Sequence, residues 1–242
     1  MADPTAALHA VRASTADLLK GLAEHRWSDG ELAAPSLCDG WTRGHVLTHL
    51  ARNADATVAT LAGALRGEVV PRYPDGPAGR DADIEAGAGR PVAEVVADVA
   101  ESAERLDRVF AAVGEAGRWD APTDRDVPAG EWALRRLVEV ELHRVDLAGD
   151  YSPDRWPPLL ISELLPDAVE SLTGRADVPV RMVVTEDGSV APSSTTREWT
   201  TGAGDPVEVR GPDWALLAWA SGRGAAVRHA LGDELPELRP WR

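Results

Sequence analysis

The sequence contains very little cysteine and no long apolar run. Cys38 is the only cysteine among the 242 residues, so no disulfide can form within the chain, which fits a reducing cytoplasm. No apolar run approaches the roughly 18 residues that a membrane helix needs. The first residues have neither the basic segment nor the apolar core of a signal peptide. We therefore expect a cytoplasmic protein without a membrane span.

Lysine is equally scarce, because Lys20 is the only one. Nearly all positive charge is therefore carried by arginine, which suits bidentate recognition of carboxylate or phosphate groups. Acidic residues outnumber basic ones, and the formal net charge is −15. Such a surface repels nucleic acid phosphates and anionic lipid. We expect small-molecule partners, no nucleic acid, no membrane and a monomeric state.

Apolar residues recur at helical spacing through the first part of the chain, and the hydrophobic content of 44 % is normal for a globular core. The predicted helices span residues 5–25, 42–65, 91–113 and 131–148, the second with Thr42 as its N-cap. The turn-rich segments 29–40, 67–89 and 118–130 are predicted loops, the second with at most one helical turn. Four such helices favour a bundle, and bundle cores commonly hold metals.

The composition changes after Gly149. Residues 151–158 contain three prolines and indicate a linker. The elements predicted after it are a helix over 159–172 with a kink or break at Pro166, strands over 178–185, 195–201 and 207–210, and helices over 214–221 and 225–231. The predicted class is α+β, with a four-helix bundle in residues 1–150 and a smaller α+β domain in residues 158–242.

Glu139 and His143 are four residues apart on a predicted helix and therefore lie on one face, one turn apart. A carboxylate and an imidazole held in this way can bind one metal ion. His49 is the candidate third ligand, because antiparallel packing of two helices can bring it to the pair. Three protein ligands leave a position open for water or substrate, as in catalytic zinc sites. The spacing leaves open that both histidines are buried polar residues and that Glu139 pairs with Arg135 or Arg136.

Other polar residues have weaker patterns. His45 lies one turn before the candidate ligand and is more typical of a solvated or substrate-facing histidine. Glu141 is expected to be solvated, and Asp146 either orients an imidazole or pairs with an arginine at the surface. Cys38 has no neighbouring pattern that indicates an activated nucleophile, so we expect it to be inert.

Arg223 stands between Gly222 and Gly224, after an apolar helix. The flanking glycines allow close backbone approach, and a guanidinium can clamp a carboxylate. The alternative is an ordinary arginine near a helix C-terminus, where the helix dipole favours positive charge.

Five short motifs follow one another along nearly the whole chain. They are Gly40-Trp41-Thr42, Thr48-His49-Leu50-Ala51, Arg136-xx-Glu139-Val140-xx-His143-xx-Asp146-Leu147, Tyr151…Trp156-Pro157 and Gly222-Arg223-Gly224. In this order they resemble the mycothiol-dependent maleylpyruvate isomerase family. The resemblance implies a DinB-like four-helix bundle that binds zinc, followed by a domain similar to sterol-carrier proteins. It places the metal ligands on His49, Glu139 and His143, and a catalytic arginine on Arg223.

The resemblance also implies an activity. Zinc, or another divalent metal, would hold mycothiol, a low-molecular-weight thiol, as its thiolate. The thiolate would add to the cis double bond of maleylpyruvate, the resulting single bond would rotate, and elimination would give fumarylpyruvate. Arg223 would hold a substrate carboxylate or the developing charge. Two alternatives stay open: a mycothiol S-transferase that acts on another electrophile, in detoxification or secondary metabolism, and a non-catalytic metal-binding relative.

Overall fold

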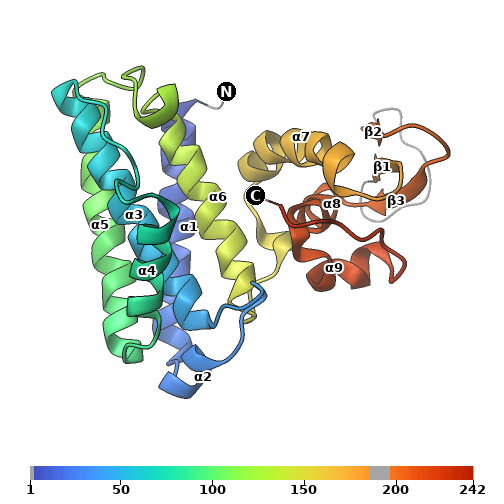
Figure 1. Cartoon of the computed structure of the whole chain (residues 1–242), viewed down its shortest axis with the longest axis horizontal. Coiled ribbons are helices and arrows are strands. Elements are labelled where there is room, and N and C mark those ends of the chain that lie inside the picture. The colour runs from blue at the N-terminus through green and yellow to red at the C-terminus, as the bar shows by residue number, and fades with distance from the viewer. Residues whose placement is uncertain (1–2, 186–196, 242) are drawn as a thin grey trace. The chain divides into compact units, whose positions relative to one another are not determined.

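The computed structural model describes residues 3–185 and 197–241. The chain forms two compact units, Met1–Gly149 and Asp150–Arg242. Helices dominate, and a three-stranded sheet lies in the second unit, so the predicted α+β class is confirmed (Figure 1). Within the described ranges, every helix is too short or too polar to span a bilayer.

Four long helices build the first unit. They are α1 (Pro4–His25), α3 (Arg43–Arg66), α5 (Val92–Glu115) and α6 (Glu131–Asp146). Helix α3 packs against α5 and α6, and α1 packs against the same two helices, which gives a four-helix bundle. The predicted N-cap is confirmed, because the Thr42 side chain accepts a hydrogen bond from the His45 backbone N–H at the start of α3.

Apolar stripes on these helices meet in the interior of the bundle. Helix α5 buries Val95, Val99, Leu106, Phe110 and Val113 at the spacing that predicted it. Val46, Leu47 and Leu50 of α3 are fully buried beside them. The core therefore holds one face of α3 rigidly, on the turns that also carry His49.

Two shorter helices lie where the sequence predicted loops. They are α2 (Asp29–Ala33) and α4 (Gly76–Ala88). The loop prediction for 67–89 is therefore wrong over most of its length. A β-carbon on Gly44 of α3 would lie 2.3 Å from the Ala88 carbonyl oxygen, and one on Gly87 would lie 2.4 Å from the Thr48 side chain. Two of the glycines at this contact thus let α4 pack closely on α3, a use of glycine that composition cannot distinguish from a turn.

The second unit combines helices with a small mixed sheet. Its elements are α7 (Pro158–Arg175), β1 (Val180–Val184), β2 (Glu198–Thr201), β3 (Val207–Gly211), α8 (Asp213–Ala218) and α9 (Gly224–Leu231). Strand β1 is central in the order β2-β1-β3, antiparallel to β2 and parallel to β3. Residues 195 and 196 of the predicted second strand lie outside the described residues. A short 3-10 turn, Pro153–Arg155, occupies the predicted linker.

Two helix interruptions predicted for this unit have different outcomes. Pro166 lies inside α7, which is assigned as one helix from Pro158 to Arg175, so of the predicted kink or break the break is wrong. Proline removes one backbone hydrogen bond, and the buried Leu160, Leu165 and Leu172 outweigh that loss. The helix end predicted at residues 222–224 is confirmed: Gly222, inside the π-helical turn Trp219–Arg223, has φ +90° and interrupts the helical backbone between α8 and α9.

Candidate metal centre

Three side chains from two helices converge in the first unit. His49 comes from α3, whereas Glu139 and His143 come from successive turns of α6. His49 Nε2 lies 2.9 Å from Glu139 Oε2, and His143 Nε2 lies 3.4 Å from the same oxygen. One ligand atom from each residue lies within 4.8 Å of the other two. The structure thus brings together all three residues that the sequence singled out as ligands.

The donor set and its spacing fit a divalent metal such as zinc. Zinc binds imidazole nitrogen and carboxylate oxygen at about 2.1 Å, which places two ligand atoms of a tetrahedral site about 3.4 Å apart. The two measured separations, 2.9 and 3.4 Å, lie near that value. Two imidazoles and one carboxylate leave the fourth position of a tetrahedral site to water or substrate.

His143 is oriented by a carboxylate behind it. Its Nδ1 lies 2.8 Å from Oδ2 of Asp146, a residue that is only 2 % exposed. A carboxylate is an acceptor, so Nδ1 carries a proton and Nε2 faces the cluster. This arrangement fixes ring orientation and raises ligand basicity in metal sites. Of the two roles considered for Asp146, the structure shows the orienting one.

His49 has the opposite environment. Its Nδ1 lies 3.3 Å from Arg80 Nη2, and a guanidinium can only donate. Nδ1 is therefore the acceptor, and the proton lies on Nε2, where it is donated to Glu139. An imidazole that binds a metal through Nε2 carries its proton on Nδ1 instead. Arg80 therefore favours the tautomer of His49 with its proton on Nε2, whereas a metal bound at Nε2 would favour the tautomer with its proton on Nδ1.

The three groups differ in charge. Burial lowers the pKa of His49 to about 4, against the opposing effect of Glu139. Burial alone would raise the pKa of Glu139, but hydrogen bonds from His143 and His49 outweigh it and hold that pKa well below its ordinary value. Burial would likewise lower the pKa of His143, but hydrogen bonds with Asp146, Cys38 and Glu139 raise it well above its ordinary value. The cluster is a carboxylate beside one neutral and one protonated imidazole.

Two arginines beside the cluster were not found from the sequence. Arg72 Nη2 lies 3.7 Å from Glu139 Oε1, and Arg80 contacts His49 and lies 5.9 Å over the Trp41 ring. Arg72 precedes α4 and Arg80 belongs to it, and both lie in the segment that was predicted to be a loop.

The remaining candidates lie around the cluster. His45 is outside it: Nδ1 accepts from the Thr42 backbone N–H at 3.2 Å, and Nε2 lies 3.0 Å from Glu85. Glu141 is 1 % exposed, so the expectation of a solvated carboxylate is wrong. Cys38 hydrogen-bonds His143 and is tied to α6, since the adjacent Leu37 N–H donates to the Asp146 carbonyl at 2.9 Å.

Arg223 lies in the second unit, at the end of the π-helical turn. Gly222 before it has φ +90°, a left-handed conformation that favours glycine. Arg223 Nη1 donates to the Ser221 carbonyl at 2.6 Å, and the side chain is half-buried. The local backbone thus holds the guanidinium close to its own turn.

The first unit matches a known protein family. A family model described as the mycothiol maleylpyruvate isomerase N-terminal domain matches residues 8–148. The chain belongs to this family. A crystal structure described as the mycothiol-dependent maleylpyruvate isomerase resembles it with a TM-score of 0.81 and 26% identity, over 99% of this chain and 98% of that one. The predicted family is therefore confirmed.

A second crystal structure of a mycothiol-dependent maleylpyruvate isomerase carries a histidine-to-alanine mutation. It matches with a TM-score of 0.81 and 25% identity, over 99% of this chain and 98% of that one. No curated protein sequence matches this member of the family. The similarity covers both units, so the α+β second unit is part of the shared fold.

Proposed function

We propose that this family member is a metal- and mycothiol-dependent isomerase that converts maleylpyruvate to fumarylpyruvate. The observation that carries the proposal is the convergence of His49 with Glu139 and His143, because three such ligands leave one coordination position open. The similarity to a mycothiol-dependent maleylpyruvate isomerase supports the choice of thiol and substrate. A divalent metal held there, with zinc as the first choice, would favour the thiolate of mycothiol, whose reversible addition to the cis double bond permits rotation.

The chain's own residues would supply orientation and positive charge. Asp146 holds His143 with its Nε2 directed to the cluster. Arg72 and Arg80 place two cations beside it, which suits a substrate with two carboxylates in a protein of net charge −15. Arg223 is proposed to receive a substrate carboxylate or the charge that develops next to it.

The isomerase proposal is tested by following the thiol. Zinc-loaded protein is incubated with an excess of maleylpyruvate and about one-tenth as much mycothiol, and both are measured over time. We expect complete conversion to fumarylpyruvate with all the thiol recovered. An S-transferase would instead consume thiol in proportion to product and leave a conjugate, and the His49→Ala protein should catalyse neither reaction. Conjugate formation without isomerisation would overturn the proposal.

A further inference from the structure

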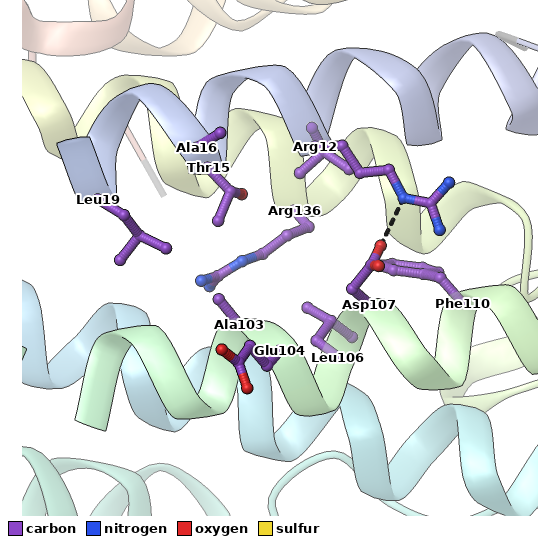
Figure 2. A pocket seen from close by; sticks show the side chains of 11 residues that line it. Arg12, Thr15, Ala16, Leu19, Ala103, Glu104, Leu106, Asp107, Phe110 and Arg136 are labelled. Atoms are coloured by element: carbon purple, nitrogen blue, oxygen red, sulfur yellow. Dashed lines mark hydrogen bonds and ion pairs between the residues drawn. The ribbon is translucent and has the colours of Figure 1, made fainter. Parts of the chain in front are cut away.

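A second candidate site lies in the bundle, between α1 and α5. It is a cavity of about 220 Å³, lined by residues of α1, α5 and α6. Leu19, Leu106 and Phe110 contribute apolar side chains to it, and none of the three proposed metal ligands lines it. Figure 2 shows the side chain of Arg136, from α6, extending into the space between α1 and α5.

Arg136 is the unusual residue of this cavity. It is 3 % exposed, yet no carboxylate oxygen within the described part of the chain lies within ion-pair distance of it. Its Nη1 donates to the Leu50 carbonyl and to Asn53 Oδ1, both at 2.9 Å. Among the described residues, only Nη1 of Arg136 has hydrogen-bond partners. An uncharged amide side chain could also donate to these two acceptors of α3. The two hydrogen bonds therefore do not explain why a charged group is buried here.

The two acids that line the cavity are already engaged elsewhere. Asp107, at the rim of the cavity, pairs with Arg12 at 2.5 Å (Figure 2), and Glu104 lies 3.9 Å from Arg108. Glu139 contacts the two histidines. Burial lowers the pKa of Arg136 to about 10, which still leaves the guanidinium charged at neutral pH. The cavity thus offers apolar walls, one unpaired positive charge, and a rim whose charges neutralise each other.

We propose that this cavity binds a small carboxylate that carries an apolar group, with the carboxylate on Arg136. A guanidinium with free donors binds a carboxylate by charge-assisted hydrogen bonds, and the apolar walls accommodate the apolar group of the ligand. The volume sets the size of the ligand: a protein cavity of about 150 Å³ holds benzene, so 220 Å³ has room for a phenyl ring and a carboxylate. The site is distinct from the metal cluster and does not depend on the proposed isomerase activity.

Benzoate is the probe that matches this description, and benzamide is its neutral counterpart of equal shape. Each is titrated into the zinc-loaded full chain, and binding is followed by calorimetry. Wild-type protein should bind benzoate saturably and at least about tenfold more tightly than benzamide, because only benzoate pairs with the buried charge. Absence of saturable binding, or equal affinity for the two probes, would overturn the proposal.

Variants locate the binding. Ala103→Leu places a larger side chain in the cavity and should abolish binding of both probes, whereas Ala97→Leu, exposed on the same helix and outside the cavity, should leave it unchanged. Arg136→Met should remove the preference for benzoate. If that protein does not fold, the Ala103→Leu result decides. Benzoate binding should persist in the His49→Ala protein. If that protein loses benzoate binding while the Ala103→Leu protein retains it, the carboxylate binds at the metal cluster and the proposal is overturned.

Discussion

Asp146 Oδ2 lies 2.8 Å from Nδ1 of His143, three residues earlier on the same helix. The helix repeat alone places the carboxylate behind the imidazole, and burial to 2 % exposure keeps water from replacing it. The pair therefore fixes which nitrogen of His143 faces the cluster. The first prediction tests that relationship directly.

Asp146→Asn should weaken zinc binding by about 10- to 100-fold. Asparagine keeps the shape of the side chain but removes the charge that makes His143 a more basic ligand. The measurement is the zinc dissociation constant by competition with a chelator. Asp17→Asn is the matched control, because Asp17 is 70% exposed and 3.8 Å from Arg144. Equal zinc affinity in the Asp146 and Asp17 variants would contradict the role given to Asp146.

Arg80→Met should have the opposite effect and tighten zinc binding, by about tenfold. The guanidinium holds the proton of His49 on Nε2, the nitrogen proposed to bind the metal, and it adds a positive charge beside the site. The same chelator competition measures the change, and Arg66→Met, at an exposed ion pair with Glu68, serves as control. Weaker zinc binding in Arg80→Met would show that Arg80 supports the site instead.

His49→Ala and His143→Ala should each purify with little or no bound metal. Removing one of three ligands leaves a carboxylate and a single imidazole, which hold a divalent ion poorly. Elemental analysis of the purified proteins gives the metal content. His45→Ala is the control: this histidine caps α3 and lies outside the cluster, so the metal should remain. A full metal content in both ligand variants would end the assignment.

Zinc affinity should rise with pH through the neutral range, by about tenfold per pH unit. His143 has a raised pKa in the metal-free protein, so it must release one proton before Nε2 can bind. The protein without zinc therefore holds one more proton than the protein with zinc, so acid favours the zinc-free form and weakens zinc binding. His49, with a pKa of about 4, adds a second proton only in stronger acid. A slope of two protons between pH 5 and 7 would contradict this charge distribution.

Arg223→Ala should keep its metal and lose turnover by about 10²- to 10³-fold in kcat, the usual cost of removing one group that stabilises developing charge. Arg228→Ala is the control from the same unit, because Arg228 is 57% exposed and lies 3.8 Å from Asp233. Metal content and steady-state rates are measured on both proteins. A normal rate in Arg223→Ala would remove the proposed catalytic role.

Local sequence accounts for the parts of the site that lie within one helix. The spacing of Glu139, His143 and Asp146 places the three on adjacent turns whatever the rest of the chain does. Thr42 predicts the start of α3 for the same reason, since a cap is a contact between close neighbours. These features follow from helical geometry, which a short segment determines by itself.

Contacts between helices were beyond the reach of the sequence. Helix α4 was missed because its glycines were taken as a sign of a turn, although Gly87 packs closely on α3. The two arginines beside the cluster lie in the same segment, 67–89, and were missed as well. Glu141 was misjudged for a related reason: helical phase says which residues share a face, but only packing says which face is covered. The unpaired charge of Arg136 is likewise visible only once the surrounding helices are in place.

The sequence by itself determined the class and the family and singled out the three proposed ligands, because motif spacing and apolar periodicity are local properties. Only the tertiary structure decided which nitrogen of each histidine faces the cluster, which cations stand beside it, and where a buried charge lacks a partner. Those properties depend on distances between segments that are far apart in the chain, such as the 90 residues between His49 and Glu139, and chain packing alone sets them.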